Sequence, residues 1–474
     1  MVANKNQSLH RNKRYALILA AGKSTRFKSL KPKVLHPLCG KSLICHVLDK
    51  LKGLNIERTF VVIGPDGDEV KSALGGYPVN FVSQKEQLGS GHAVVAAAPQ
   101  LRDLRGSLLV LYADTPLIRT QTLRRLLKTR EKQKADQVLL TTDYENPSGY
   151  GRIIRNEKGE AMDIVEEKDA SGEQKAIREV NAGLNCFRIS SLLEALSQLS
   201  RANAAQEYYL TDMLRILRNG GKKVVTISTD RPDEARGVNN REELSLVESN
   251  LRAQIARRWM CEGVTILNPS SVYIDESVVL SPDAIIYPGV LLEGETKVGA
   301  GCVIHSFCHL KDTVLSEEVI VDHCSVIRNS SIGKNTRVGP FAHLRDNTLI
   351  GPEARIGSFV EVKKSRIGKR TTAAHLSYLG DAEIGSQVNV GAGTITCNYD
   401  GIRKHKTVIE DQVFIGSDSQ LVAPVTLHEG SYVAAGSSIT EDVPEYALGI
   451  ARARQINKEG WTRRRAGERK KKEK

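Results

Sequence analysis

The stretch Leu19–Arg26, LAAGKSTR, is the first place in the chain where the residue types suggest phosphate binding. It directly follows an apolar run expected to form a strand, so its backbone amides lie where a strand end opens into a phosphate-binding turn. A P-loop would also need glycine at position 17, where this chain has Leu17, and the sequence therefore argues against a P-loop nucleotidase. Lys33 follows soon after and could reach over a polyphosphate, although a lone lysine is more often simply solvated.

Asp114 is a second candidate because it ends the apolar run Leu108–Tyr112. Ligands of α/β sheets bind at the carboxyl ends of strands, and a carboxylate there can hold Mg²⁺ through oxygen. Such a site needs a further polar ligand from a distant part of the chain. The same aspartate could instead cap a helix.

A histidine and a tyrosine, His375 and Tyr378, form a third candidate in a region that otherwise repeats every six residues. The aliphatic spacing shortens to five from Val362 to Ile367 and again from Leu379 to Ile384, which predicts a local bend around the histidine. A lone histidine is more often structural, but one beside a tyrosine in a broken repeat favours an active site between coils or subunits. Further polar and small residues that the repeat does not require are Asn389, Ala392, Thr394–Gly401 and Ser417.

The elements that must position Lys33 and Asp114 alternate between strand and helix patterns from Arg14 to about Arg241. Helical patterns such as Gln121–Lys132 separate short apolar runs, among them Tyr15–Ala20, Thr59–Gly64, Leu108–Tyr112 and Val224–Ile227. This alternation predicts a Rossmann-like α/β domain with a mainly parallel sheet.

The elements that must position His375 have a different period. Aliphatic residues recur at every sixth position, at Val326, Ile332, Val338, Leu344, Ile350, Ile356, Val362, then at Ile384, Val390, and from Ile409 to Ile439. A six-residue period is the hexapeptide signature of a parallel β-helix, in which three repeats close one triangular coil. Imperfect repeats precede these from about Val272 to Leu310.

Residues 242–260 are apolar at three- and four-residue spacing and contain neither glycine nor proline, which predicts a connecting helix. The chain is therefore expected to divide into a basic extension (1–14), an α/β domain (15–241), a linker helix (242–262), a β-helix domain (263–460) and a basic tail (461–474).

The formal net charge of +13 lies mostly in the two tails, so the body of the chain is almost neutral. Residues 461–474 carry eight Lys/Arg and two Glu, and the first fourteen residues carry four Lys/Arg. Charge runs without apolar residues have nothing to bury, so both tails are expected to be solvated or disordered and a nucleic-acid partner is not expected. No membrane span or cleavable leader is expected, and eight scattered cysteines favour reduced thiols in the cytoplasm.

Five motifs of the N-terminal part carry a family resemblance: L-A-A-G-K-x-T-R, P-K-V-L-H, Q-x-E-Q-L-G-x-G-H-A, G-Y-G-R-I and G-V-N-N-R. They resemble the bifunctional N-acetylglucosamine-1-phosphate uridyltransferase/glucosamine-1-phosphate N-acetyltransferase family, over about Tyr15 to Trp461. The resemblance implies a UDP-N-acetylglucosamine site of Leu19, Ala20, Ala21, Gly22, Lys33, Gln84, Gly89, Ser90, Tyr112, Ala113, Asp114, Gly151, Glu166, Asn181 and Asn239. It also implies Mg²⁺ on Asp114 and Asn239, with the neighbouring Asn240 easily confused with the second ligand.

Two segments around His375 and Asn398 resemble the acetyltransferase motifs A-G-H-L-x-Y-L-G-D and G-A-G-T-I-T-C-N-Y-D-G of the same family, whose β-helix is left-handed. The resemblance implies His375 as general base. It further implies a sugar-phosphate site of Arg345, Lys363, Tyr378 and Asn389, and an acetyl-CoA site and its surroundings of Ala392, Asn398, Tyr399, Ser417, Ala435 and Arg452, with Asn398 and Tyr399 toward the sugar.

The chain departs from the family pattern at several positions. Ser90 and Ala182 stand where threonine is common, and Ala113 and Ala374 where glycine is common. Each of these residues is small. Asp346 follows Arg345 where the family usually has proline, which puts the geometry of that loop in question.

The function expected from the resemblance is acetyl transfer from acetyl-CoA to glucosamine 1-phosphate, followed by transfer of the uridylyl group of UTP. An imidazole suits the first step because its ordinary pKa lies near neutral pH, and positioned charges suit the second. A homotrimer is expected, since a β-helix has flat sides and the His375 segment needs groups such as those near Arg452 to complete a pocket.

Three alternatives remain open on the sequence. The β-helix could merely oligomerise a single-function nucleotidyltransferase. A carbonic-anhydrase-like enzyme could bind zinc through His305, His309, His323 and Cys324, although their spacing is irregular. The chain could also be a scaffold resembling a translation exchange factor subunit, which intact Asp114 and Asn239 oppose.

Overall fold

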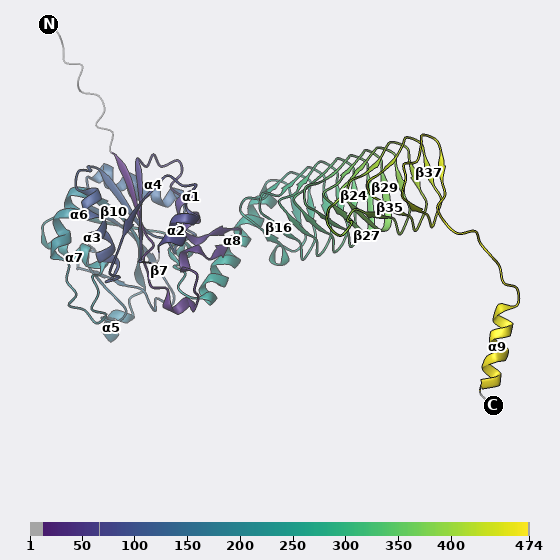
Figure 1. The fold of residues 1–474 in the computed structure, drawn as a ribbon. Coiled ribbons are helices and arrows are strands. Elements are labelled where there is room, and N and C mark those ends of the chain that lie inside the picture. The colour runs from purple at the N-terminus through teal and green to yellow at the C-terminus, as the bar shows by residue number, and fades with distance from the viewer. Residues whose placement is uncertain (1–12, 66, 473–474) are drawn as a thin grey trace, which may run out of the picture. The chain divides into compact units, whose positions relative to one another are not determined.

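The computed structural model describes residues 13–65 and 67–472, so residues 1–12 of the predicted N-terminal extension lie outside the described residues. The chain forms two compact units that divide between Arg252 and Ala253. The first is an α/β fold and the second a left-handed coil of short parallel strands, which confirms the predicted fold class (Figure 1).

The first unit is built on one sheet, and one of its inner strands carries the LAAGKSTR turn at its end. Strand β1 (Arg14–Leu19) pairs in parallel with β6 (Ser107–Tyr112) and β4 (Arg58–Ile63), and β4 pairs with β5 (Val79–Ser83). The predicted mainly parallel sheet contains antiparallel members on the other side of β6. These are β10 (Glu179–Arg188), which lies between β6 and β7 (Gln137–Asp143), and the pair β8 (Arg152–Arg155) and β9 (Ala161–Val165), while β11 (Val224–Ser228) is parallel to β7.

Helices cover both faces of this sheet because successive residues of its strands point to opposite sides. Leu17 belongs to one apolar core and Ile18 to the other, and both are fully buried. Burying one such side chain stabilises the fold by about 1.5–3 kcal/mol. The helices are α1 (Leu43–Asp49), α2 (Asp68–Ala73), α3 (Ser90–Leu101), α4 (Thr120–Gln133), α5 (Gly172–Lys175), α6 (Ile189–Ala195) and α7 (Met213–Asn219).

Short elements complete the first unit and flank the ends of its strands. They are the two-stranded ribbon β2 (Pro37–Leu38) and β3 (Lys41–Ser42), and the single 3-10 turns η1 (Thr25–Phe27), η2 (Lys33–Leu35), η3 (Leu196–Gln198), η4 (Leu210–Asp212) and η5 (Pro232–Ala235).

Helix α8 (Arg241–Cys261) occupies the stretch for which the sequence predicts a connecting helix. Its buried residues Val247, Leu251, Ile255 and Trp259 recur every four positions, as one stripe of an α-helix requires.

The second unit is a β-helix in which most strands pair in parallel with the strand three positions later, so that three strands make one coil, whereas the long strands β27 and β29 each run over two faces. We name its three faces A, B and C in chain order. Turn η6 (Pro269–Ser271) precedes the first strand of face B. Face A contains β12 (Thr265–Ile266), β15 (Ile285–Ile286), β18 (Val303–Ile304), β21 (Ile320–Val321), β24 (Arg337–Val338), the start of β27 (Arg355–Lys363), the start of β29 (Thr372–Gly380), β31 (Asn389–Val390), β34 (Phe414–Ile415), β37 (Tyr432–Val433) and β39 (Leu448–Gly449). 

Face B contains β13 (Tyr273–Ile274), β16 (Leu291–Glu293), β19 (His309–Lys311), β22 (Val326–Arg328), β25 (His343–Arg345), the ends of β27 and β29, β32 (Ile395–Cys397), β35 (Gln420–Val422) and β38 (Ser438–Ile439). Face C contains β14 (Val279–Leu280), β17 (Lys297–Val298), β20 (Val314–Leu315), β23 (Ser330–Ile332), β26 (Thr348–Ile350), β28 (Arg366–Ile367), β30 (Ala382–Ile384), β33 (Thr407–Ile409) and β36 (Val425–Leu427).

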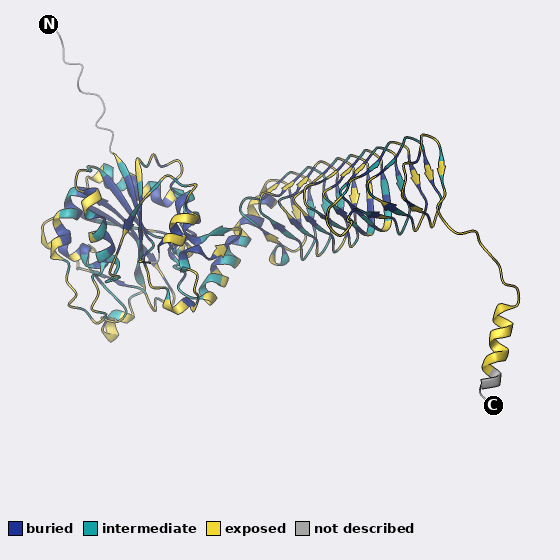
Figure 2. Cartoon of the chain, viewed as in Figure 1, coloured by how far each residue is buried: buried dark blue, intermediate teal, exposed yellow. Residues whose placement is uncertain are grey.

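Buried and exposed residues alternate along the coils (Figure 2), and most strands bury one aliphatic residue that stacks on its counterparts in neighbouring coils. Ile286, Ile304 and Val321 form such a column on face A and are all fully buried. Because each coil covers its neighbours, the strands bury a continuous core that no single repeat could bury alone.

The bend predicted around His375 is wrong, because the five-residue step lies at the turn between faces B and C, the B–C corner, and is not specific to the coil of the histidine. Leu310 to Leu315 and Ile327 to Ile332 show the same step in coils without the histidine. Val326 was predicted to point inward, but the inward residue of its strand is Ile327, which is fully buried and pairs with Leu344.

The end of the chain forms helix α9 (Trp461–Lys472), whose side chains from 461 to 469 are exposed. The tail is solvated, as predicted, but it forms a helix rather than the disordered segment that was the alternative expectation. Residues 473–474 lie outside the described residues. None of the described helices is both long enough and apolar enough for a membrane span.

Candidate active sites

The turn after β1 opens onto a cavity of about 500 Å³, a size typical of small-molecule sites. Strand ends β1 and β6 and the start of α3 surround it, as expected for the carboxyl edge of an α/β sheet. Eleven of the residues predicted for the nucleotide site line it: Leu19, Ala20, Ala21, Gly22, Lys33, Gln84, Gly89, Ser90, Tyr112, Asp114 and Asn239.

The start of α3 is shaped so that its backbone can approach a ligand closely. Gly89 has φ of +111°, and a Cβ there would lie 2.6 Å from the Tyr208 carbonyl oxygen, so only glycine fits. The buried Gln84 amide donates to the Gly89 carbonyl oxygen at 3.3 Å, and Ser90 Oγ accepts from the Leu210 N–H at 3.1 Å. Both side chains therefore hold the loop as well as line the cavity.

Lys33, Asp114 and Asn239 meet at one edge of this cavity, although they are far apart in the sequence. Lys33 Nζ lies 2.5 Å from Asp114 Oδ2 and 3.2 Å from Asn239 Oδ1. Arg26 also donates to Asn239 Oδ1, at 3.1 Å. The Val238 N–H donates to the Asp114 carbonyl oxygen at 2.9 Å, which fixes the Asn239 loop against the end of β6. One side-chain oxygen of Asp114 and one of Asn239 thus converge on the Lys33 ammonium.

The structure also separates the two neighbouring asparagines. Asn240 Oδ1 accepts from the Glu243 N–H at 2.8 Å, so Asn240 caps the start of α8. Glu243 in turn accepts from the Asn239 N–H at 2.6 Å and from the Asn240 amide at 3.0 Å. These contacts leave the Asn239 side-chain oxygen facing the cavity.

A second cavity of about 330 Å³ shares Arg26, Tyr112, Asp114 and Asn239 with the first. Asn181 lines it, as predicted for the sugar, and its Oδ1 accepts from the Gly183 N–H at 2.9 Å. Its wall also contains Tyr144 and Tyr150, whose ring centroids are 4.8 Å apart and whose pKa values burial raises.

Three predicted residues lie outside the lining of both cavities. Ala113 is buried in the core because strand alternation points Tyr112 and Asp114 toward the cavities and Ala113 away, so its side chain makes no wall. Gly151 and Glu166 lie next to each other, since a Cβ at Gly151 would be 3.3 Å from Glu166 Oε1. Burial raises the pKa of Glu166, which accepts from Thr211 Oγ1 at 2.9 Å.

Sequence reasoning missed Arg26, Tyr144 and Tyr150 as lining residues. Arg26 closes the LAAGKSTR motif, so its place in the motif was a usable signal. Tyr150 likewise stands in the motif G-Y-G-R-I, whereas Tyr144 gave no signal, because its pairing with Tyr150 depends on the path of the segment between β7 and β8.

His375 lies in a row of equivalent positions at the turn between faces A and B, the A–B corner. His375, Ala392, Ser417 and Ala435 each directly precede a left-handed corner residue in four successive coils. The Asp418 N–H donates to the Ala392 carbonyl oxygen at 2.7 Å, and the Gly436 N–H to that of Ser417 at 2.8 Å. Arg452 donates to the Ala435 carbonyl oxygen at 3.0 Å. The exposed His375 is therefore followed, in the next three coils, by the small residues Ala392, Ser417 and Ala435, and this row ends at Arg452.

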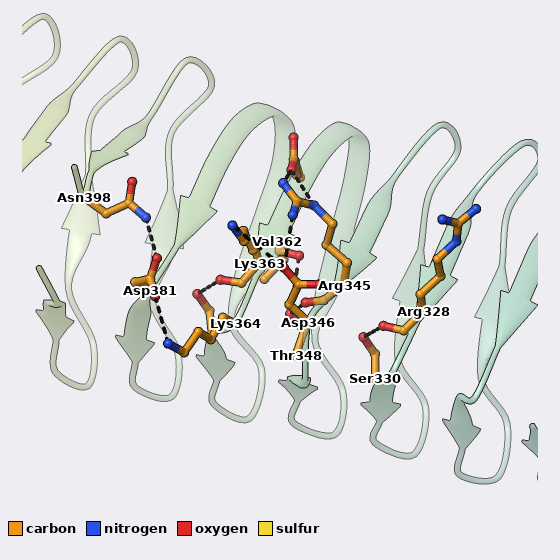
Figure 3. A network of polar contacts seen from close by, with 12 residues as sticks. Arg328, Ser330, Arg345, Asp346, Thr348, Val362, Lys363, Lys364, Asp381 and Asn398 are labelled. Atoms are coloured by element: carbon orange, nitrogen blue, oxygen red, sulfur yellow. Dashed lines mark hydrogen bonds and ion pairs between the residues drawn. The ribbon is translucent and has the colours of Figure 1, made fainter. Parts of the chain in front are cut away.

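The predicted phosphate ligands Arg345 and Lys363 are neighbours at the B–C corner (Figure 3). Lys404, which sequence reasoning missed, joins them from the loop 398–406, where it pairs with Tyr399 in an isolated antiparallel bridge. The nearby Lys404 amine lowers the pKa of Lys363. Three basic side chains thus gather at one corner, an arrangement that suits recognition of a phosphate group.

The remaining predicted residues of the β-helix flank these two corners. Tyr378 lies in β29 beside Glu361 of β27, and its hydroxyl would be 2.4 Å from a Cβ at Gly380, so glycine makes room for the ring. Asn389 begins β31 on face A. The buried Asn398 donates to Asp381 Oδ2 at 2.6 Å, whereas Tyr399 is exposed and donates to the Gly401 carbonyl oxygen at 2.6 Å.

The histidines weighed as zinc ligands are stacked in a ladder rather than grouped. His305 stacks on His323 at 4.7 Å between ring centroids, whereas His309 contacts Glu293 at 2.9 Å. Within residues 13–65 and 67–472, no group of three or more His, Cys, Asp and Glu side chains is arranged to hold a metal ion.

The chain matches three family models. Residues 16–208 match the MobA-like NTP transferase domain, residues 270–367 the GMPPB C-terminal domain, and residues 406–441 the hexapeptide repeat of succinyl-transferase. The first match contains the lining residues of both cavities as far as Glu207, and the other two matches lie within the β-helix.

Curated relatives match over almost the whole chain. "Bifunctional protein GlmU" of Geobacillus sp. (strain WCH70) is 48% identical over 95% of this chain and 98% of its own length. The proteins of the same name from Alkaliphilus oremlandii and Koribacter versatilis are 48% and 45% identical, over 95% and 97% of this chain and 98% and 99% of their own lengths. With such identity over both units, the chain belongs to the bifunctional GlmU family.

Proposed function

We propose that the chain synthesises UDP-N-acetylglucosamine in two steps at two sites. The β-helix acetylates glucosamine 1-phosphate with acetyl-CoA, and the α/β unit then joins the product to the uridylyl group of UTP and releases pyrophosphate. The observation that carries this proposal is the meeting of Lys33, Asp114 and Asn239 at the edge of a 500 Å³ cavity, in a chain whose β-helix also presents His375 and a cationic corner.

In the uridylyl step, the phosphate oxygen of the sugar attacks the α-phosphorus of UTP, and the bond from that phosphorus to the bridging oxygen of pyrophosphate breaks. The Lys33 ammonium gives up its contact with the Asp114 carboxylate, contacts phosphate oxygens instead and balances their charge. The glycine-lined turn and the start of α3 hold the nucleotide, and Asn181 orients the sugar in the adjoining cavity. Catalysis is positioning plus charge compensation, without a covalent protein intermediate.

The donor set at Asp114 fits Mg²⁺. One carboxylate and one amide oxygen converge on a single ammonium, and Mg²⁺ usually takes one or two protein oxygens together with phosphate oxygens and water. Asp114 and Asn239 would hold the ion, which when bound would supply further neutralisation of the triphosphate.

In the acetyl step, Arg345, Lys363 and Lys404 hold the phosphate of glucosamine 1-phosphate at the B–C corner. His375 removes a proton from the amine, whose nitrogen attacks the thioester carbon, and the C–S bond breaks to release CoA. The row Ala392, Ser417 and Ala435 leaves room for the thioester arm. The Gly391 and Gly393 N–H groups donate to carbonyl oxygens of other coils, so among the described residues the Ala392 N–H is the candidate donor for the oxyanion.

A homotrimer is part of the proposal. The A–B corner exposes a column of large apolar residues, in which Phe307, Phe341, Phe359 and Leu376 are 68%, 50%, 61% and 64% exposed. The Phe341 and Phe359 rings stack at 5.2 Å. A contiguous apolar column marks an interface, and the adjoining His375 row would then lie where subunits meet.

We place the activity in the cytoplasm, where UTP and acetyl-CoA are available and where the eight free cysteines would stay reduced. The deciding experiment supplies glucosamine 1-phosphate, acetyl-CoA, UTP and Mg²⁺ and identifies products by mass. UDP-N-acetylglucosamine, CoA and pyrophosphate are expected. Coupling of supplied N-acetylglucosamine 1-phosphate without any acetylation would instead favour a single-function nucleotidyltransferase with a structural β-helix.

A further inference from the structure

The B–C corner after Arg345 is one residue longer than its neighbours. The inward residues Leu344 and Ile350 are six apart, against five in the coils on either side. In the regular corners the left-handed residue donates to the last strand residue of the preceding coil, as the Asn329 N–H does to the Lys311 carbonyl oxygen at 3.0 Å and the Lys364 N–H to that of Arg345 at 3.2 Å. Asp346 follows Arg345 as Lys364 follows Lys363, so Asp346 is the regular corner residue and Asn347, which donates to the Asn329 carbonyl oxygen at 2.8 Å, is the additional one.

The backbone at Asp346 explains which residues can stand there. Asp346 and Asn347 have φ of +58° and +63°, in the left-handed region that aspartate, asparagine and glycine tolerate best. Proline is locked near −65° and cannot adopt this conformation. The corner of this chain is therefore built differently from one in which proline follows the arginine.

Asp346 turns its carboxylate back onto the phosphate ligands (Figure 3). Asp346 Oδ2 lies 3.1 Å from Arg345 NH1 and 3.8 Å from Lys363 Nζ. Arg345 also donates to Glu361 Oε1 at 2.6 Å, so each of the two cations already faces a carboxylate. The Asp346 side chain is 49% exposed, which leaves it free to swing away.

We propose that Asp346 determines the anion affinity of the acetyltransferase site by competing, as a tethered carboxylate, with the phosphate of the sugar substrate for Arg345 and Lys363. This inference rests on the proposed acetylation of glucosamine 1-phosphate. A phosphate monoester carries more charge and more acceptor oxygens than a carboxylate, so it displaces Asp346. Every anion that binds must first break the contacts of Asp346 with Arg345 and Lys363, so the affinity for every anion is lowered. Anions that bind these two cations only weakly are therefore rejected.

Two variants remove the charge without straining the corner. Asp346→Asn keeps the shape and Asp346→Gly removes the side chain, and both residues tolerate a positive φ. Asp312→Asn is the matched control, because Asp312 also has a positive φ at the B–C corner, two coils earlier, and its Oδ1 accepts a backbone N–H from Glu295.

The experiment measures acetyl-transfer kinetics of the full chain with glucosamine 1-phosphate, and competitive inhibition by inorganic phosphate. In both Asp346 variants, KM for glucosamine 1-phosphate and the inhibition constant for phosphate should fall about two- to fivefold, the range of partly exposed ion pairs. The kcat, the KM for acetyl-CoA and uridylyl transfer should stay at the parental values, and Asp312→Asn should match the parent throughout.

An unchanged or higher KM for glucosamine 1-phosphate in both variants, with the parent active, would overturn the role of Asp346 alone. A fall in one variant only would also overturn it, since the charge is absent from both. Lack of acetylation by the parent would overturn the proposed function itself, and with it this inference.

Discussion

At the scale of single residues, the role proposed for Asp114 and Asn239 depends on their meeting as a pair. The structure brings their oxygens onto the Lys33 ammonium from the end of β6 and from the loop before α8. Either oxygen alone would be an ordinary surface group. Together with Arg26 they form an edge of the cavity where the charge of a triphosphate can be balanced.

We predict that Asp114→Ala lowers uridylyl transfer by at least about 10²-fold, the size of effect seen when a positioned charge-stabilising group is lost. Acetyl transfer should persist, because His375 lies in the other unit. Pyrophosphate release and CoA release measured on the same preparation test this, with the exposed Asp103→Ala as control. Undiminished Mg²⁺-dependent pyrophosphate release would refute the assignment.

His375 offers the reciprocal experiment. It is exposed at the A–B corner and contributes nothing to the buried aliphatic columns, so His375→Ala should leave the free energy of unfolding almost unchanged. Loss of a general base should reduce acetyl transfer by about 10²–10⁴-fold. The loss should be larger near neutral pH than in mild alkali, where more of the substrate amine is already neutral.

The matched measurement is uridylyl transfer to supplied N-acetylglucosamine 1-phosphate, which His375→Ala should leave at the parental rate. Acetylation at the parental rate would exclude His375 as the base. Loss of both activities in a folded, oligomeric variant would contradict the two-site arrangement.

Single residues also mark where sequence reasoning stops. Motifs identified Lys33, Asp114 and Asn239, because they depend on local patterns at strand ends and helix starts. They did not identify Lys404, because its approach to Lys363 depends on the path of the loop 398–406. The family resemblance placed Ala113 in the site, whereas strand alternation turns its side chain into the core.

At the scale of elements, periodicity predicted both folds, since a period of six and a strand–helix alternation each follow from what must be buried. The linker helix followed from four-residue spacing in the same way. The corner steps did not follow, because a coil can close with five or six residues at the B–C corner without moving its inward column. The bend predicted at His375 and the inward position predicted for Val326 both failed for this reason.

One element has a positioning role that the sequence did not reveal. Turn η5 precedes the Asn239 loop and is held by the buried Glu234, which accepts from Thr122 Oγ1 at 2.6 Å and from Arg119. Ala235 at its end lines the second cavity. The carboxylate of Glu234 therefore fixes the start of the loop that carries Asn239.

We predict that Glu234→Ala lowers the free energy of unfolding of the first unit by about 1–3 kcal/mol, because it leaves the buried Thr122 hydroxyl unpaired. Uridylyl kcat/KM should fall about tenfold as Asn239 shifts, since small displacements in a site are costly. Glu234→Gln should fall between variant and parent, and the exposed Glu69→Ala should match the parent. A destabilised Glu234→Ala with parental kcat/KM would disprove the positioning role.

At the scale of the whole molecule, the two units use different strategies to build a site. The α/β unit gathers residues distant in sequence at one edge of a sheet, so its cavities are complete within one unit. The β-helix distributes His375 and the cations Arg345 and Lys363 over two corners of its coils. A site of this second kind gains walls when a second subunit covers a corner, and the exposed column on the A–B corner fits such a role.

The proposed trimer leads to a prediction that separates assembly from chemistry. Phe359→Asp places a charge in the middle of the exposed column, beside Phe341, and burying an unpaired carboxylate at an interface is costly. Light scattering of the parent should give about three times the chain mass of 52.1 kDa, and Phe359→Asp should lower this toward one chain. Acetyl transfer should fall with the trimer, whereas uridylyl transfer should persist.

Val279→Asp, at a 46% exposed residue of face C, should keep the parental mass and both activities. A monomeric parent at micromolar concentration, or a monomeric Phe359→Asp variant with full acetyl transfer, would show that the β-helix site is complete in a single chain.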